Sequence, residues 1–115
     1  MFNAAAKDVR VNERNMKLHG ALDDRFRTPA PGDPNTLNLG GRYVLNHFPE
    51  DAPWNFVAVG RGHDTAYWAD FLDALAKIDP DPVNIEHEDT ELGQLEGLQT
   101  SAATLLAAAE DLTSP

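Results

Sequence analysis

Apolar residues recur at helical spacing in two stretches of the chain. In the first stretch they are three or four positions apart, at Trp68, Phe71, Leu72, Leu75 and Ile78. This spacing predicts an amphipathic helix over residues 64–78, with Asp64 as its N-cap and prolines beyond its end. In the second stretch the stripe is made of Leu92, Leu95, Leu98, Leu105, Leu106 and Ala109. It predicts a second helix over residues 91–110, which Thr90 would cap.

Between these helices, a short β-prone run ends in charged residues. Val83 and Ile85 are β-branched, and the next four residues, 86–89, all carry ionisable side chains. The pattern predicts a strand over residues 83–88 that delivers charged side chains to a site. Because side chains alternate along a strand, we expect Glu86 and Glu88 on the face opposite Ile85. The order helix, strand, helix is typical of an α/β protein with a parallel sheet.

The N-terminal half has no comparable pattern. By pattern alone, residues 2–11 fit a frayed terminus, a helix start or a short strand equally well. Residues 12–59 are rich in turn formers, so we expect mostly a long loop, and loops of that length are often functional. Within this range, residues 12–22 have room for one or two helical turns and residues 37–48 for a weak extended pair.

Composition narrows the class of protein. A chain of 115 residues suggests one domain or part of one, and 42% hydrophobic with 24% charged residues is compatible with a globular core. The net charge of −10 disfavours nucleic acid and anionic membranes as partners, since both bind basic surfaces. The chain has no cysteine, which excludes disulfides and zinc–thiolate sites. With no transmembrane run and no secretory signal, we expect a cytoplasmic protein.

Several polar residues fit either a site or an ordinary structural role. Lys7 and Asp8 fit an acid/base pair at a strand end, or a charged terminal tail. Arg61 fits a ligand for a sugar hydroxyl or a phosphate, or a solvated arginine. His63 fits a substrate contact or a turn residue, and Asp64 a substrate contact or a helix cap.

The same two interpretations apply nearer the C-terminus. Glu86 fits a metal ligand, or a partly buried carboxylate paired with a lysine or arginine. His87 fits a general acid or base, or a histidine satisfied at a strand end. Trp54 fits a sugar-stacking platform, or packing. The sequence has no phosphate-binding glycine loop, no nucleophile elbow and no zinc-protease motif.

Four short motifs, in their order along the chain, resemble a known family. They are Lys7-Asp8, Val59-Gly-Arg-Gly-His-Asp64, Ile85-Glu-His-Glu-Asp89 and Glu96-Gly-Leu98. Together they resemble the C-terminal part of the sugar phosphate isomerase/epimerase family, the xylose-isomerase-like TIM barrels. The resemblance implies that residues 1–115 are roughly the last two βα units of a barrel, with strands over residues 1–11 and 83–88.

The resemblance also implies a sugar or sugar phosphate as substrate and metal-assisted proton transfer next to a carbonyl. In the family, two carboxylates from earlier strands, a histidine on the seventh strand and a glutamate on the eighth hold a divalent metal such as Mg²⁺ or Mn²⁺. Glu86 matches this glutamate, whereas Ala5 stands where the histidine is expected. The residues implied as catalytic are Lys7, Asp8 and His87. Those implied to bind substrate are Trp54, Arg61, His63 and Asp64, with residues 25–53 as a lid or substrate wall.

With one ligand of the metal set present, we expect the chain to be an isomerase fragment that is inactive alone. The alternative is a non-catalytic α/β interaction module. Such a module would complete its sheet with a partner polypeptide, or with a second copy of itself as a homo-oligomer, through exposed strand edges.

Overall fold

The chain folds into two compact units. The structure is a computed structural model and describes residues 4–23, 34, 36–40, 43–46, 51–78 and 82–113. We call the first unit, Met1–Arg10 with Asn55–Pro115, the α/β unit, and the second, Val11–Trp54, the inserted unit.

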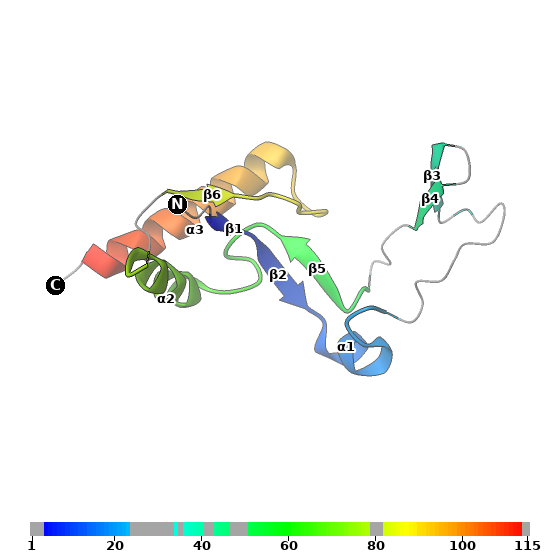
Figure 1. The fold of residues 1–115 in the computed structure, drawn as a ribbon, viewed down its shortest axis with the longest axis horizontal. Helices are drawn as coiled ribbons and strands as arrows, with labels where there is room; N and C mark the ends of the chain where they lie inside the picture. Colours follow the sequence, from blue (N-terminus) through cyan, green and yellow to red (C-terminus); the bar gives the residue numbers. More distant parts are fainter. Residues whose placement is uncertain are drawn as a thin grey trace. The chain divides into compact units, whose positions relative to one another are not determined.

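A pair of parallel strands forms the centre of the α/β unit. β1 (Ala4–Ala6) and β6 (Val83–Ile85) lie side by side, as Figure 1 shows. The pairing extends to the Glu86 N–H, which donates to the Ala6 carbonyl oxygen over 3.0 Å. The Cα partners are Ala4 with Val83, Ala5 with Asn84, and Ala6 with Ile85. The predicted α/β class with parallel strands is confirmed, although β6 is shorter than the predicted 83–88.

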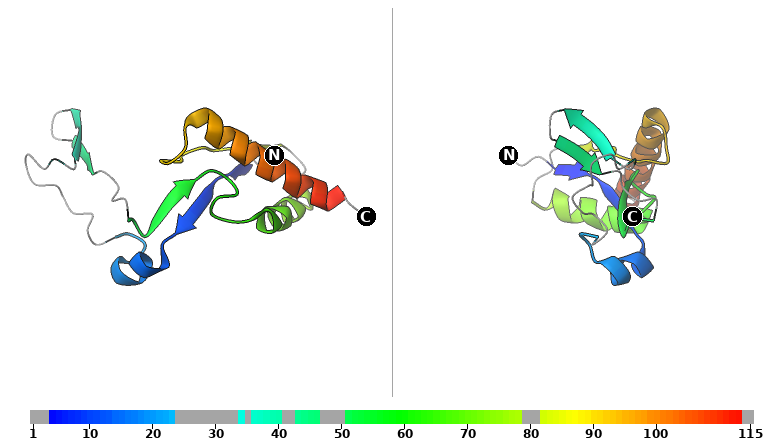
Figure 2. Two further views of the ribbon diagram at one scale, coloured as in Figure 1. Left: turned by 180° about the vertical axis from the view of Figure 1, so that it is seen from behind. Right: turned by 90° about the vertical axis from the view of Figure 1, so that its right-hand side faces the viewer.

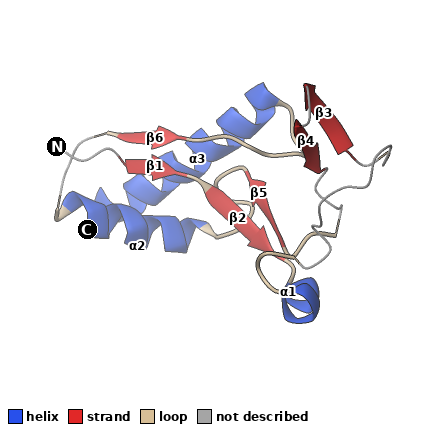
Figure 3. Ribbon diagram, turned by 45° about the vertical axis from the view of Figure 1, so that its right-hand side comes forward, coloured by secondary structure: helices blue, strands red, loops and turns tan. Residues whose placement is uncertain are grey.

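The other strands form two further small sheets. β2 (Asp8–Val11) pairs with β5 (Trp54–Val57), and their arrows run in opposite directions in Figure 3. β3 (Thr36–Gly40) pairs with β4 (Tyr43–Asn46) as an antiparallel hairpin. In the described part of the chain, each sheet has two strands, and the strands do not close into a barrel.

Two helices accompany the parallel pair. α2 (Thr65–Ala76) begins at Asp64, whose Oδ1 accepts a hydrogen bond from the Tyr67 N–H over 2.9 Å, so the predicted cap is confirmed. α3 (Gln94–Thr113) starts and ends three residues later than the predicted 91–110. Seen from behind, α3 lies in front of β1 and β6 (Figure 2, left), so it covers one face of the pair.

The core between these elements is built from small residues and one large aromatic side chain. Ala6, Val59, Trp68 and Ala108 are buried together. The alanines let the strand and α3 approach closely, and Trp68 fills the space beside them. Partly buried residues packed against this core are Ala69, Phe71, Leu72, Val83 and Leu105. Trp68, Phe71 and Leu72 of the predicted stripe therefore lie on the side of α2 that reaches the core, whereas Ile78 lies beyond the end of α2 and is 77% exposed.

The inserted unit confirms the helical turns and the extended pair that the sequence leaves room for within residues 12–59. It contains the short helix α1 (Glu13–His19), the hairpin β3–β4 and the start of β5. Local side-chain bonding explains the helix: Asn12 Oδ1 accepts from the Asn15 N–H over 3.1 Å, and Gly20 ends it with a φ of +72°. Much of the predicted lid over residues 25–53 lies outside the described residues, and its role stays a prediction.

In the described part of the chain, no helix combines the length and the apolar character needed to cross a membrane.

Candidate functional site

The parallel pairing of β1 and β6 brings three charged side chains together where the strands end. Lys7 Nζ lies 3.3 Å from Glu86 Oε2 and 3.1 Å from Glu88 Oε1. It also lies 4.0 Å from the centroid of the Phe56 ring, as a cation–π contact. We call Lys7, Glu86 and Glu88 the open-face cluster. The hydrogen bond to Glu88, assisted by that to Glu86, raises the pKa of Lys7, so its ammonium group stays charged.

The open-face cluster lies on the face of the strand pair that α3 does not cover. Along β6 and the residues after it, Asn84, Glu86 and Glu88 are exposed, whereas Val83, Ile85 and His87 are partly buried. In β1, Ala5 is exposed and Ala6 is fully buried. This alternation follows the strand pleat. The predicted separation of Glu86 and Glu88 from Ile85 is confirmed, and a polar surface is left on the uncovered face.

Asp8, the neighbour of Lys7, is buried and holds the turn before α2. Its Oδ2 accepts hydrogen bonds from the N–H groups of Gly60, Gly62 and His63 over 2.9, 3.0 and 3.1 Å. Its Oδ1 lies 2.7 Å from His63 Nδ1. Burial alone would raise the pKa of Asp8, but these bonds, chiefly that with the His63 ring, lower it. Asp8 is therefore an ionised carboxylate that organises the turn.

Gly62 is required where Asp8 meets this turn. A Cβ atom on Gly62 would lie 2.2 Å from the Val9 carbonyl oxygen and 2.6 Å from Asp8 Oδ1. Neither atom has room to move away, because the first belongs to the backbone of β2 and the second is held by its hydrogen bonds. Gly62 therefore has a structural reason: it lets the backbone approach a buried carboxylate.

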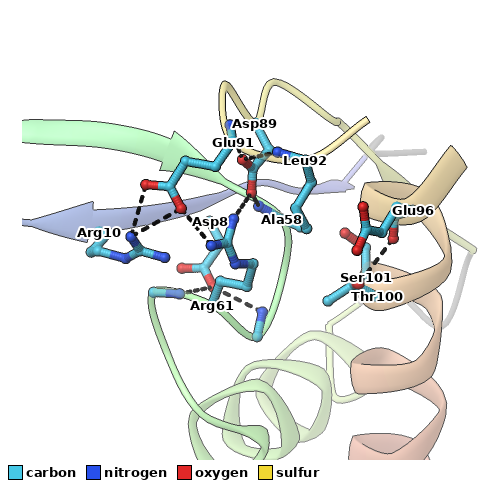
Figure 4. Close-up of polar contacts among 12 residues, drawn as sticks. Asp8, Arg10, Ala58, Arg61, Asp89, Glu91, Leu92, Glu96, Thr100 and Ser101 are labelled. Atoms are coloured by element: carbon cyan, nitrogen blue, oxygen red, sulfur yellow. Dashed lines mark hydrogen bonds and ion pairs between the residues drawn. The ribbon is translucent and has the colours of Figure 1, made fainter. Parts of the chain in front are cut away.

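Asp89 is a second buried carboxylate and holds the same turn from the other side (Figure 4). Its Oδ2 accepts from the Ala58 N–H over 2.8 Å and from Arg61 Nη1 over 2.6 Å. Its Oδ1 accepts from the N–H groups of Glu91 and Leu92 over 2.8 and 3.0 Å. Burial would raise the pKa of Asp89, but these bonds, led by that from Ala58, lower it to about 2.

Arg61 is held between acidic side chains. Besides its bond to Asp89, its guanidinium pairs with Glu91, and Glu91 in turn lies 3.1 Å from Arg10 Nη1 (Figure 4). Hydrogen bonds to Asp89 and then to Glu91 raise the pKa of Arg61, so the charge is permanent. A substrate that binds Arg61 must share it with these carboxylates or displace Glu91, which is the more exposed of the two.

His63 combines a fixed ring with an exposed edge. Because Asp8 is ionised, its Oδ1 accepts a hydrogen bond from the His63 Nδ1–H, and in the neutral ring this leaves Nε2 as the acceptor. The ring stacks on Tyr67 with centroids 4.2 Å apart, and 43% of the side chain is exposed. A buried aspartate behind a histidine is an arrangement that supports general base chemistry at Nε2.

His87 lies on the helix side of β6, away from Glu86. A Cβ atom on Gly97 of α3 would lie 1.9 Å from His87 Cε1, so only glycine lets the helix pass the ring. Among the described residues, His87 Nδ1 is buried without a hydrogen-bond partner. The structure therefore places this predicted catalytic residue in the packing between β6 and α3, apart from the open-face cluster.

The remaining predicted site residues have structural partners. Trp54 belongs to the inserted unit, where its Nε1 donates to the Ala21 carbonyl oxygen over 2.7 Å. Asp64 caps α2. Asp8, Arg61 and His63 are brought together around one turn, and Lys7 and Glu86 are brought together on the uncovered face.

The residues of this chain do not by themselves fit the divalent metal that the resemblance implies. The Ala5 side chain offers no donor atom, and the Glu86 carboxylate is paired with the Lys7 ammonium 3.3 Å away, which competes with a cation. Across the described ranges, no three His, Asp or Glu side chains are grouped so that they could hold a metal ion. Mg²⁺ and Mn²⁺ need several oxygen ligands.

Sequence reasoning missed three contributors to the site: Asp89, Glu91 and Ser101. Ser101 Oγ, fully buried on α3, accepts from the Val59 N–H over 3.0 Å. The one available signal for the missed residues was the pair of glycines at 60 and 62, which implies a turn that needs acceptors for its N–H groups.

A comparison with protein-family models, with curated proteins and with solved structures gave no match to this chain.

Proposed function

We propose that the α/β unit forms the last two βα units of a sugar phosphate isomerase/epimerase barrel. In this proposal β1 is the seventh strand and β6 the eighth, and α2 and α3 are their outer helices. The observation that carries the proposal is the adjacent, parallel pairing of β1 with β6, with Lys7 and Glu86 3.3 Å apart beyond their ends. In such barrels the catalytic groups lie beyond the C-terminal ends of the strands.

The open-face cluster would be this chain's contribution to the sugar site. Lys7 offers a permanent ammonium group to a hydroxyl or a phosphate, and Glu86 and Glu88 offer carboxylate acceptors to hydroxyls. The neutral form of His63, with its Nδ1–H donated to Asp8, would take a proton at Nε2, whereas Asp8 would act by positioning His63. Because the metal ligands are incomplete, we expect no metal-dependent turnover of an aldose or ketose by the purified chain.

The proposal can be tested by supplying the missing units. The chain, from Ala4 onward, would be fused behind the first six βα units of a sugar isomerase/epimerase of this type. We expect a folded chimera that gains metal-dependent turnover when Ala5→His restores the missing donor, and loses it again when Glu86→Gln is added. Asp111→Asn, on the exposed C-terminal end of α3, is the matched control.

Two results would count against the proposal. One is metal-dependent turnover of a sugar by the unmodified chain alone. The other is a chimera that folds and carries Ala5→His but binds neither metal nor sugar, as judged by calorimetric titration.

A second candidate function is a non-catalytic interaction module, and the small size of the sheets favours it. β1 and β6 pair with each other, and the described strands offer neither of them a second neighbour. Unpaired strand edges are templates for another chain. Light scattering behind size-exclusion chromatography is the test: a well-folded monomer at every concentration would count against this candidate.

A further inference from the structure

α3 carries a second apolar stripe, next to its core-facing side. Its core-facing residues are Gly97, Ser101 and Ala108, all buried. The second stripe, which we call the leucine stripe, is made of Leu95, Leu98 and Leu106, with side chains 70%, 41% and 67% exposed. At about 100° per residue these three leucines lie within roughly 80° of one another around the helix axis.

The leucine stripe points away from the turn that holds the site. Thr104, which meets Gly60 of that turn, lies two positions before Leu106 and is therefore roughly opposite it on the helix. Ala102 and Ala109 fall on the same strip as the leucines and extend it along the helix. Large apolar side chains gathered on one exposed helix face mark an interaction surface.

The charges of α3 indicate what kind of partner this surface fits. The helix has no lysine or arginine, and its charged residues are Glu96, Glu110 and Asp111. Two of these lie in the last turns, where the helix dipole is itself negative. Of these three, Glu110 lies next to the stripe, about 40° from Leu106 around the helix axis, and a second copy would bring like charges together in a chain whose net charge is −10. The surface therefore favours an apolar face with basic borders over its own copy.

We propose that the leucine stripe docks an amphipathic helix of another polypeptide, whose apolar face is bordered by lysine or arginine. The inference rests on the proposed function in one respect: a polypeptide that supplies strands to this sheet would also supply the helix that follows a strand. Beyond the proposed function, the inference specifies which side of α3 binds the partner and which charge the partner carries.

A pair of designed peptides tests the inference. Both would be ~18 residues long, close to the length of α3, with leucines at the same helical positions. One would carry lysines and the other glutamates at the remaining positions. Fluorescence anisotropy with the purified full chain should show binding of the leucine–lysine peptide, and binding at least about tenfold weaker for the leucine–glutamate peptide. Added salt should weaken the first interaction.

Substitutions in the chain locate the surface. Leu106→Ser and Leu95→Ser should each weaken binding of the leucine–lysine peptide by about tenfold, because each removes an exposed apolar contact. Leu22→Ser is the matched control, since Leu22 is 93% exposed but belongs to the inserted unit. Circular dichroism would show that all three variants keep their helix content.

Three outcomes would overturn the inference. They are equal binding of both peptides, binding that Leu106→Ser does not weaken, and a dimer of the chain that Leu106→Ser dissociates, since the last would make the surface a self-association site. The peptide-binding measurement by fluorescence anisotropy does not depend on sugar turnover. An active chimera without peptide binding would therefore contradict this inference alone, and an inactive chimera with Leu106-dependent binding would contradict the proposed function alone.

Discussion

Lys7–Asp8 and Glu88–Asp89 are two pairs of charged neighbours, and each pair is divided between two environments. Lys7 and Glu88 contact each other on the uncovered face of the strand pair, where the Glu88 side chain is 61% exposed. Asp8 is 1% exposed, and the Asp89 side chain is fully buried, each with several N–H donors. The comparison teaches that the two pairs divide their charges in the same way. The buried aspartate of each pair builds the turn, and its charged neighbour lies on the uncovered face, where a ligand could reach it.

The largest effect that tests this division is expected for Asp8→Ala. Removing the carboxylate leaves the buried N–H groups of Gly60, Gly62 and His63 without their acceptor, so we expect a loss of about 3–5 kcal/mol in the free energy of unfolding. Urea unfolding followed by circular dichroism measures it. Asp70→Ala, on the exposed face of α2, is the control and should change stability by less than about 1 kcal/mol. Equal losses of unfolding free energy in Asp8→Ala and Asp70→Ala would contradict the distinction between the buried and the exposed carboxylates.

Gly60→Ala should have the next largest effect. Gly60 has a φ of +97°, and a Cβ atom there would lie 2.2 Å from Thr104 Oγ1. We expect a loss of about 2–4 kcal/mol from backbone strain and the steric clash together. Adding Thr104→Ala should recover the part due to the clash. Gly93→Ala, where no atom lies within 4 Å of the new Cβ, serves as the control. If Gly60→Ala is as stable as the unmodified chain, α3 does not approach the turn as closely as described.

Acid should act mainly through the buried carboxylates. The pKa of Asp89 in the folded chain, about 2, is below its usual value of 3.8. Its contribution to stability is therefore fully present above about pH 4 and is lost as the pH falls toward 2, with a magnitude of about 2 kcal/mol. Unfolding free energies measured across this range should fall less steeply for Asp89→Asn than for the unmodified chain. A parallel pH dependence of the two proteins would contradict the assignment.

The smallest effect is expected on the uncovered face. Glu86→Gln and Lys7→Ala should each change the unfolding free energy by less than about 1 kcal/mol, because exposed ion pairs contribute little. The side chains of Lys7 and Glu86 are 26% and 55% exposed. A loss comparable with that of Asp8→Ala would show that the open-face cluster is structural, and would leave the proposed sugar site without available groups.

The sequence was sufficient for elements whose signals are local. The spacing of Trp68, Phe71 and Leu72 and the cap at Asp64 are contained within one helix, and α2 follows them closely. The β-branched residues at the start of β6 and the alternation of side chains after them are equally local signals. The placement of Glu86 and Ile85 on opposite faces could therefore be predicted. The helical turns expected within residues 12–22 are confirmed by α1, whereas the strand β5 lies in a range where only loop was expected.

The site was harder to predict because its contacts are distant in sequence. Asp8 meets Gly60 across 52 positions, and Val59 meets Ser101 across 42. No spacing rule connects such residues, so the choice between a catalytic and a structural role for Asp8 needed the fold. Asp89 was missed for the same reason, since its partners at Ala58 and Arg61 lie on the other side of α2 in the chain.

The hydrogen bond between the Asn12 N–H and the Pro53 carbonyl oxygen has a consequence for how this sequence can vary. The bond is 2.8 Å long and joins the two ends of the inserted unit. A segment whose ends already meet can be lengthened, shortened or exchanged while the chain still leaves and returns at the same place. Residues 13–52 are thus the part of the protein in which evolution, or an engineer, has the widest freedom to change length.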